Sequence, residues 1–294
     1  MRDFKEITAQ VQAWIDQMQA AGKHVDIDTI NQHLEEMMTV QNNAPADYFN
    51  GFTPQQMYKM MYSPLEDGCP VQLRTLADNQ IAEIPIMRQV LCLMTILASG
   101  ELKLTAQGYI PPKIVNELYQ IGTHSWYTDW FKQKNEPKVE EVQVLRVVLK
   151  ECGLIKTRIG KMSLTAKGKS LLSKHNELLH TVMLFLLRDY NTGWLDAYDD
   201  MEVGNVGRLY SLWLLHHFGD QWRNTDFYAD EYFRAFPAMI NDDIYGYRIF
   251  NRLFRCIGLC DINERAEDRG HEFGQKVIKT DLLDKVFVFQ EPQQ

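Results

Sequence analysis

The most constraining stretch of this sequence is residues 145–172, LRVVLKECGLIKTRIGKMSLTAKGKSLL. Its first apolar residues recur at helical spacing and stop at Gly153, where a helix is expected to end. Two short alternating runs follow, residues 154–158 and 162–165, with a tight turn at Gly160-Lys161 between them. The stretch therefore predicts a helix, a β-hairpin and a further helix in direct succession.

The composition is typical of a globular protein in a reducing compartment. The chain has 294 residues, and 45% of them are hydrophobic, which is enough for more than one core. Its N-terminus lacks the apolar core of a signal peptide, and no apolar run approaches the ~20 residues that a membrane span needs. The five cysteines form no C-x-x-C pair. We expect a cytoplasmic bacterial protein with no membrane partner.

Charge is distributed unevenly along the chain. The net charge of −8 argues against tight non-specific binding to DNA, because such binding requires cations that neutralise phosphates. Acidic residues cluster at residues 196–202 and 264–268. In contrast, residues 156–174 contain no acid and six cations: Lys156, Arg158, Lys161, Lys167, Lys169 and Lys174.

The order of apolar and polar segments predicts a mainly α protein with small β-hairpins. An N-terminal helical region precedes two modules that repeat the same order of parts. The predicted segments are a helical hairpin (1–43), a linker with a capped helix (44–84), a first module (85–176), a connecting helix with an acidic linker (177–204) and a degenerate second module (205–294).

Helix-capping residues support the N-terminal part of this division. Asp26 or Asp28 is expected to cap the second helix of the hairpin, and Thr53 with Gln56 forms a capping box for the helix that follows. For the hairpin, a role as a scaffold or dimerising element is favoured over a catalytic one.

The two modules are aligned through the ends of their third helices. In the first module we expect helices at 86–98, 111–119 and 139–152, a strand at 101–105, and an insertion at 122–137 with stacked aromatic residues. The second module has helical patterns at 207–218, 228–236 and 245–257, and strand patterns at 259–263 and 276–279. LLKECGLIK, around Gly153, aligns with LFRCIGLCD, around Gly258, so the sequence predicts an internal duplication.

The third helix of each module carries polar residues at the spacing of a single exposed face. Arg, Asn and Gln are residue types that read guanine and adenine edges, and basic residues in a hairpin suit phosphate contacts. A solvated helix face explains the same pattern without any ligand, and Glu140, Glu141 and Glu151 would repel phosphate. The candidate nucleic-acid-binding residues are Gln143, Arg146 and Lys150, then Lys156, Arg158 and Lys161 of the first hairpin, and Arg248, Asn251, Arg252 and Arg255.

No motif for catalysis or for a cofactor is present. The sequence lacks a phosphate-binding glycine loop, a G-x-S-x-G turn and an H-E-x-x-H helix. His216 is interpreted as a core or interface residue, and Asp196, Asp199 and Asp200 as a solvated linker in preference to a cation site. We therefore expect no enzyme activity, no cofactor and no metal.

GLIKTRIGKMSLTAKGKSLL resembles the helix end, wing and LTxxG close of bacterial winged-helix regulators of the MarR-like type. LKLTAQGYIPPKIVNELY and GFTPQQMYKMMYSP resemble segments of a bacterial family with tandem winged-helix-like modules. The first resemblance implies binding of double-stranded DNA through the third helix and wing, as in a transcriptional regulator. The alternative is a non-enzymatic protein–protein interaction module built on winged helices. Both hypotheses stay open at this point.

Overall fold

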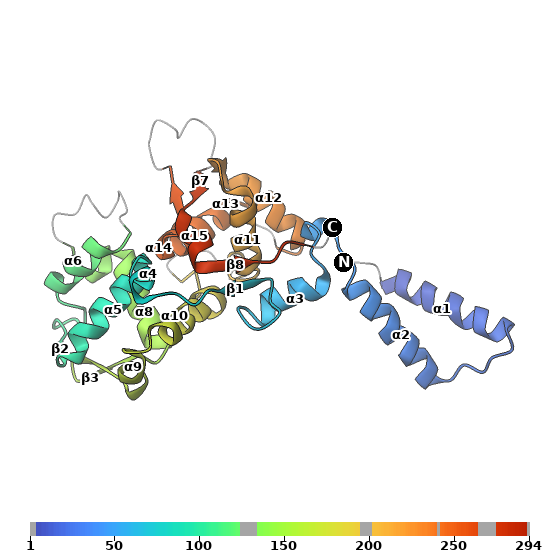
Figure 1. Cartoon of the computed structure of the whole chain (residues 1–294), viewed down its shortest axis with the longest axis horizontal. Coiled ribbons are helices and arrows are strands. Elements are labelled where there is room, and N and C mark those ends of the chain that lie inside the picture. The colour runs from blue at the N-terminus through green and yellow to red at the C-terminus, as the bar shows by residue number, and fades with distance from the viewer. Residues whose placement is uncertain (1–3, 124–133, 195–201, 240–241, 264–274, 293–294) are drawn as a thin grey trace. The chain divides into compact units, whose positions relative to one another are not determined.

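The structure is a computed structural model that describes residues 4–123, 134–194, 202–239, 242–263 and 275–292 (Figure 1). The fold is mainly helical with small antiparallel sheets, as the sequence predicts. Contacts divide the chain into two compact units, Met1–Met57 with Pro292–Gln294 and Tyr58–Glu291. The predicted aromatic stack in the insertion and the acidic residues 196–200 lie outside the described residues.

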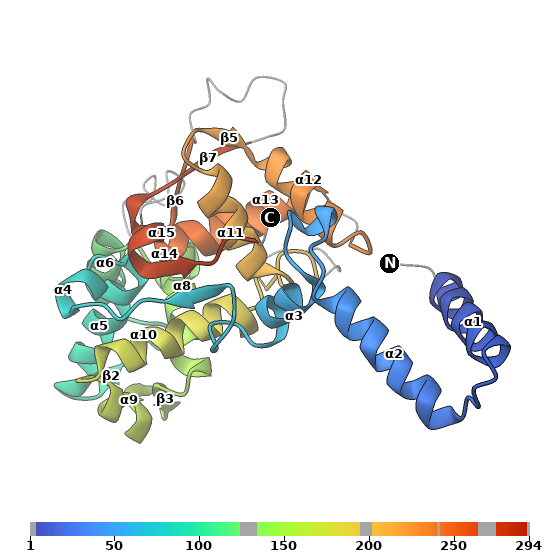
Figure 2. The same ribbon diagram turned by 45° about the vertical axis from the view of Figure 1, so that its right-hand side comes forward.

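The first unit begins with the predicted helical hairpin. Helix α1 (Phe4–Ala20) and helix α2 (Ile27–Asn42) run in opposite directions (Figure 2). Gly22 adopts a left-handed φ of 68° just after α1, where its lack of a side chain makes that conformation accessible. Asp26, one of the two predicted capping residues, accepts a hydrogen bond from the Thr29 backbone N–H at 2.8 Å and so caps α2.

The predicted capping box is confirmed at the start of helix α3 (Pro54–Tyr62), which follows a short 3₁₀ turn, η1 (Asp47–Phe49). The backbone N–H of Gln56 donates to Oγ1 of Thr53 at 3.1 Å. The backbone N–H of Thr53 donates in return to Oε1 of Gln56 at 2.9 Å. Two N–H groups that the helix itself cannot satisfy therefore have partners.

The first module of the second unit follows the predicted order. Helix α5 is buried along most of its length and packs against α6, α8 and β4. The strands form one antiparallel sheet in the order β2-β4-β3, so the last strand lies in the middle. The elements are α5 (Pro85–Ala98), β2 (Leu102–Lys103), α6 (Pro112–Ile121), η2 (Glu136–Lys138), α8 (Glu140–Glu151), β3 (Ile155–Arg158), β4 (Lys161–Leu164) and α9 (Ala166–Leu171).

The second module repeats this order with a different third helix. Its strands again place the last strand in the middle, in the order β5-β7-β6. The third helix starts as an α-helix, continues as a π-helix and ends with a short α-helical turn. The elements are α11 (Arg208–Phe218), β5 (Arg223–Asn224), α12 (Thr225–Ala235), α13 (Asp242–Gly246), η4 (Tyr247–Phe254), α14 (Arg255–Ile257), β6 (Cys260–Ile262), β7 (Lys276–Lys279) and α15 (Asp281–Val286).

The third helices of both modules end in the same way. Gly153 and Gly258 adopt left-handed φ angles of 70° and 92°. The residue after each glycine donates its N–H to the carbonyl five positions earlier, at 2.8 Å in both modules. Each glycine donates to the carbonyl three positions earlier, at 2.9 Å and 2.8 Å. This is the Schellman arrangement, and it satisfies carbonyls that the helix end leaves free.

A threonine then joins the last strand of each module to the helix end. The Oγ1 of Thr165 donates to the Gly153 carbonyl at 2.6 Å, and the Oγ1 of Thr280 donates to the Gly258 carbonyl at 2.7 Å. Both threonines immediately precede the closing helices α9 and α15. The sequence alignment of the two glycines is thus accompanied by the same hydrogen bonds in both modules.

Segments far apart in the sequence complete the second unit. Strand β1 (Val71–Leu73) pairs antiparallel with β8 (Phe287–Phe289). Helix α4 (Asp78–Ile81) precedes the first module, and α10 (His175–Leu184) continues into the π-helix η3 (Phe185–Asp189) between the modules. The sequence predicts one continuous connecting helix at 177–190 but gives no signal for β1 or β8, because their pairing depends on contacts between distant segments.

The turn of the first hairpin contains a strained residue. The predicted turn at Gly160-Lys161 in fact consists of Ile159 and Gly160, with φ angles of 49° and 66°. Two consecutive positive φ angles define a type I′ turn, which favours Asn-Gly. A β-branched residue rarely adopts such an angle, and the Ile159 side chain is 89% exposed, so it gains nothing from burial.

We expect Ile159→Asn to raise the free energy of unfolding by about 1 kcal/mol, because Asn tolerates the left-handed conformation better than Ile. Urea unfolding of the purified protein measures this change. Gly160→Ala is the matched control at the neighbouring turn position; it has open space around the added methyl group and should lower stability. A less stable Ile159→Asn variant would contradict the turn assignment.

Candidate nucleic-acid interface

Basic residues of the first module share one face of its sheet. Arg158 on β3 lies opposite Lys161 on β4, and Lys161 lies opposite Lys103 on β2. Directly opposite residues point to the same face, and so does Lys156, two residues before Arg158. All four side chains are exposed. We call Lys103, Lys156, Arg158 and Lys161 the basic sheet face.

The positive charge of this face is mostly uncompensated within the described part of the protein. Glu101 places Oε2 2.9 Å from Nζ of Lys161, and both side chains are 56% exposed. In the part of the chain that the structure describes, Lys103, Lys156 and Arg158 form no hydrogen bond or ion pair. Like charges on directly opposite strand positions lower stability. The face therefore has a net positive charge that an external anion would relieve.

The second sheet has no equivalent row of cations. Lys276 on β7 occupies the position of Lys161, but it lies opposite Asn224. Val277 lies between Arg223 and Ile262. The row of three cations is thus specific to the first module among the described strands. Lys103 was not among the residues singled out from the sequence, because only the pairing of β2 with β4 brings it next to Lys161.

The predicted outer face of α8 is largely covered. Lys150 is exposed and pairs with Glu151 at 3.1 Å, whereas Gln143 is half-buried. The expectation that Arg146 is exposed is wrong. Its Nη1 donates to Oε1 and Oε2 of Glu136 at 2.8 Å and 3.0 Å, and to the Gly108 carbonyl at 2.9 Å.

The carboxylate that binds Arg146 is itself buried and structural. Glu136 is 5% exposed and also accepts a hydrogen bond from the Ile110 backbone N–H at 2.6 Å. Together Arg146 and Glu136 join α8 to the loop before α6. The sequence does not predict this pair, because Glu136 is contributed by the segment inserted between α6 and α8.

In the third helix of the second module, two arginines expected on the outer face are buried. Arg248 is fully buried and donates from Nη1 to the Val203 carbonyl at 2.7 Å. Arg252 is 6% exposed and donates to the Thr192 carbonyl at 2.8 Å. Asn251 and Arg255 are half-buried. The spacing i, i+3, i+7 defines one face only in an α-helix, and the wider turn of the π-helix η4 rotates these side chains inward.

An ion pair connects α8 of the first module to η4 of the second module. Nε of Arg252 lies 3.1 Å from Oε1 of Glu140, the first residue of α8. Burial raises the pKa of the Glu140 carboxyl above its usual value, and the Arg252 guanidinium partly opposes that shift. The N-terminal end of a recognition helix is the part that usually contacts bases. In this protein that end of α8 contacts η4, and three predicted base-reading arginines, Arg146, Arg248 and Arg252, are held in internal hydrogen bonds, whereas Lys150 stays exposed.

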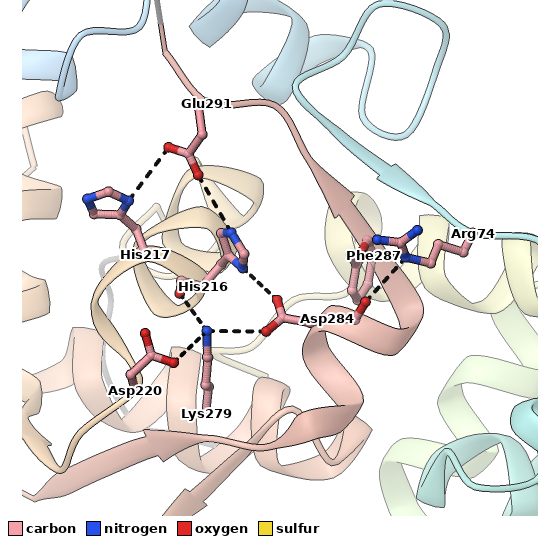
Figure 3. A network of polar contacts seen from close by, with 8 residues as sticks. All are labelled: Arg74, His216, His217, Asp220, Lys279, Asp284, Phe287 and Glu291. Atoms are coloured by element: carbon pink, nitrogen blue, oxygen red, sulfur yellow. Dashed lines mark hydrogen bonds and ion pairs between the residues drawn. The ribbon is translucent and has the colours of Figure 1, made fainter.

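A second polar cluster surrounds the C-terminal strand (Figure 3). Nδ1 of His216 lies 2.6 Å from Oδ1 of Asp284, and Nζ of Lys279 lies 2.9 Å from Asp220 and 3.2 Å from Asp284. Glu291 lies 3.7 Å from both His216 and His217. These contacts hold the end of the chain against α11.

His216, predicted as a core or interface residue, is half-buried, and its ring stacks on Phe289 at 4.0 Å. Among the described residues, no group of three or more His, Cys, Asp or Glu side chains has the arrangement of a metal site. Arg74 fixes the same region by donating from Nε to the carbonyls of Asp284 and Phe287 at 3.2 Å and 3.1 Å. We therefore interpret the cluster as a set of structural contacts that fix the position of β8.

In comparisons with known proteins, the chain matches no protein family, no curated protein and no solved structure. Within the described parts of the chain, no helix combines the length and the apolar character needed to cross a lipid bilayer.

Proposed function

We propose that the chain binds double-stranded DNA through its phosphate backbone, with little dependence on base sequence. The observation that carries this proposal is the row Lys103–Lys161–Arg158 across three strands, extended by Lys156. Lys161 pairs with the exposed Glu101, while the other three cations have no hydrogen bond or ion pair within the described residues. Exposed cations neutralise phosphates, and each contact releases bound counterions. In this role the protein binds the duplex whatever its base sequence.

We further propose that each module is a winged helix and that the two arose by duplication. The order helix, strand, helix, helix, strand, strand occurs twice, and in both modules the last strand lies between the other two. The matched Schellman turns and threonine hydrogen bonds support the equivalence. In this arrangement the hairpin β3–β4 is the wing, and the wing of the first module contacts the DNA backbone.

Weak dependence on sequence follows from the covered third helices. Arg146, Arg248 and Arg252 form internal hydrogen bonds, so they are not free to donate to base edges. Contacts to phosphates position a protein on DNA but do not select a sequence. We therefore expect different duplexes of equal length to bind with similar affinity.

The test compares the same charge reversal at equivalent positions of the two sheets. We expect Lys161→Glu to weaken binding to a mixed-sequence duplex on the order of 10-fold at about 50 mM salt. The slope of log K against log salt should also become less steep by about 1. Lys276→Glu makes the identical change in net charge at the matching position of β7 and should leave binding nearly unchanged. Fluorescence anisotropy of a labelled duplex measures both quantities.

Two outcomes would overturn the proposal. The first is undetectable binding of the unmodified protein to duplex DNA at low salt. The second is an equal loss of affinity in the two variants, since net charge and not the basic sheet face would then be responsible. Either result would favour the alternative in which the modules bind another protein.

A further inference from the structure

Helices α1 and α2 form a hairpin without a core. Among the described side chains of residues 7–42, none is buried. The helices contact each other through a stack of Trp14 on His33, with ring centroids 4.0 Å apart and planes at 10°. In proteins, most of the stability of a helix comes from packing its apolar face against other structure and not from its intrinsic helix propensity. The hairpin therefore needs an additional apolar surface to be stable.

The half-buried side chains follow a heptad spacing in both helices. On α1 they are Ile7, Val11, Trp14 and Met18, and on α2 they are Ile30, Leu34, Met37 and Gln41. Both sets advance by four, three and four residues, which is the 3.5-residue repeat of coiled coils and four-helix bundles. Because both helices have this spacing, they can pack against other helices that have a heptad repeat.

The apolar stripe is wider than a two-helix contact requires. Ile15 on α1 and Thr29, His33 and Asn42 on α2 are also half-buried, each next to a heptad position. A stripe of this width is typical of helices in a bundle, whereas a pair of helices needs only the narrower seam. The surface that is missing is thus about the size of a second helical hairpin.

Charge favours a second copy of this chain as the occupant. The half-buried stripe contains no Asp, Glu, Lys or Arg, and the acidic residues Asp16, Glu35 and Glu36 are exposed beside it. Two stripes can meet without placing like charges opposite one another, although the chain as a whole carries a net charge of −8. A two-fold axis lets one surface complement itself, which is the commonest arrangement in oligomers.

We propose that the α1–α2 hairpins of two chains pack together as a four-helix bundle and make the protein a dimer. This assignment does not depend on DNA binding. The bundle buries the heptad positions of all four helices. Helix formation in residues 4–42 is then coupled to association, so it depends on protein concentration.

Analytical ultracentrifugation of the full chain tests the proposal. We expect a mass of twice 34.3 kDa at micromolar concentration. Val11→Lys with Leu34→Lys should give a monomer, because four lysines would lie inside the bundle. The matched control, Gln12→Lys with Gln32→Lys, adds the same charge at exposed positions one residue from Val11 and two residues from Leu34, and should stay a dimer.

A second measurement needs no substitution. Hydrogen exchange of the unmodified protein should show protection in residues 4–42 that is lost on dilution, while the second unit keeps its protection. A monomer at all concentrations, or a dimer that persists in the Val11→Lys, Leu34→Lys variant, would overturn the proposal. The first result would favour packing on other parts of the same chain or on a different protein.

Discussion

Replacing Arg208 with methionine is expected to lower the free energy of unfolding by about 3–5 kcal/mol. The guanidinium is 2% exposed and donates to four oxygens. Nε contacts the Gly204 carbonyl at 2.8 Å, and Nη1 contacts the Leu186 carbonyl at 2.9 Å. Nη2 contacts the Tyr190 carbonyl and Oδ1 of Asn205.

The size of the effect depends on the buried oxygens that lose a hydrogen-bond donor when methionine replaces Arg208. Burial lowers the pKa of Arg208 to about 10, which reflects the cost of removing its charge from water. That cost disappears with the arginine, so the net loss is smaller than the sum of four hydrogen bonds. Each acceptor left unsatisfied in the interior still costs about 1–3 kcal/mol. The loss remains large because one side chain joins η3, the segment before α11 and α11 itself.

Arg188→Met is the matched control for this experiment. Arg188 belongs to η3, the helix whose Leu186 carbonyl accepts a hydrogen bond from Arg208. It is 43% exposed, and within the described residues its hydrogen bonds go to the neighbouring Asp189, at 2.8 Å. Exposed ion pairs contribute about 0–1 kcal/mol, so we expect a change within about 0.5 kcal/mol. In urea unfolding, the decrease in the free energy of unfolding should be several-fold larger for Arg208→Met than for Arg188→Met. Equal losses would show that the network around Arg208 is not what holds these segments together.

Local signals in the sequence predict the local structure correctly. The helix ends at Gly153 and Gly258, the cap at Asp26 and the capping box of Thr53 and Gln56 are all present. Each of these features depends on residues within one or two turns of helix, so their chemistry can be read directly. The same holds for the hairpin β3–β4, although its turn lies one residue earlier than predicted.

Which helix faces are exposed could not be predicted, for two separate physical reasons. Along α8 the periodicity is helical, but Glu136 from the preceding insertion covers Arg146. Along η4 the periodicity itself changes, because a π-helix places successive residues differently from an α-helix. Neither reason applies to the basic residues of the β3–β4 hairpin, since a two-residue turn fixes which strand positions share a face.

The equivalent glycines of the two modules allow a direct test of how the modules pack. A methyl group on Gly153 would meet no atom within 4 Å. On Gly258 it would lie 2.7 Å from Cδ of Pro85, the first residue of α5 in the first module. Both glycines have a left-handed φ, which costs an alanine about 1–2 kcal/mol. Only the second also requires the neighbouring helix to move.

We therefore expect Gly153→Ala to lower the free energy of unfolding by about 1–2 kcal/mol and Gly258→Ala by about 3–5 kcal/mol. Urea unfolding of both variants measures the difference. Because the backbone strain is similar at the two positions, the excess loss at Gly258 reports the contact with Pro85. Pro85→Ala in the Gly258→Ala background should recover part of this excess, as residues in contact are not additive. Equal losses at the two glycines would mean that the second module does not pack against α5 at this point.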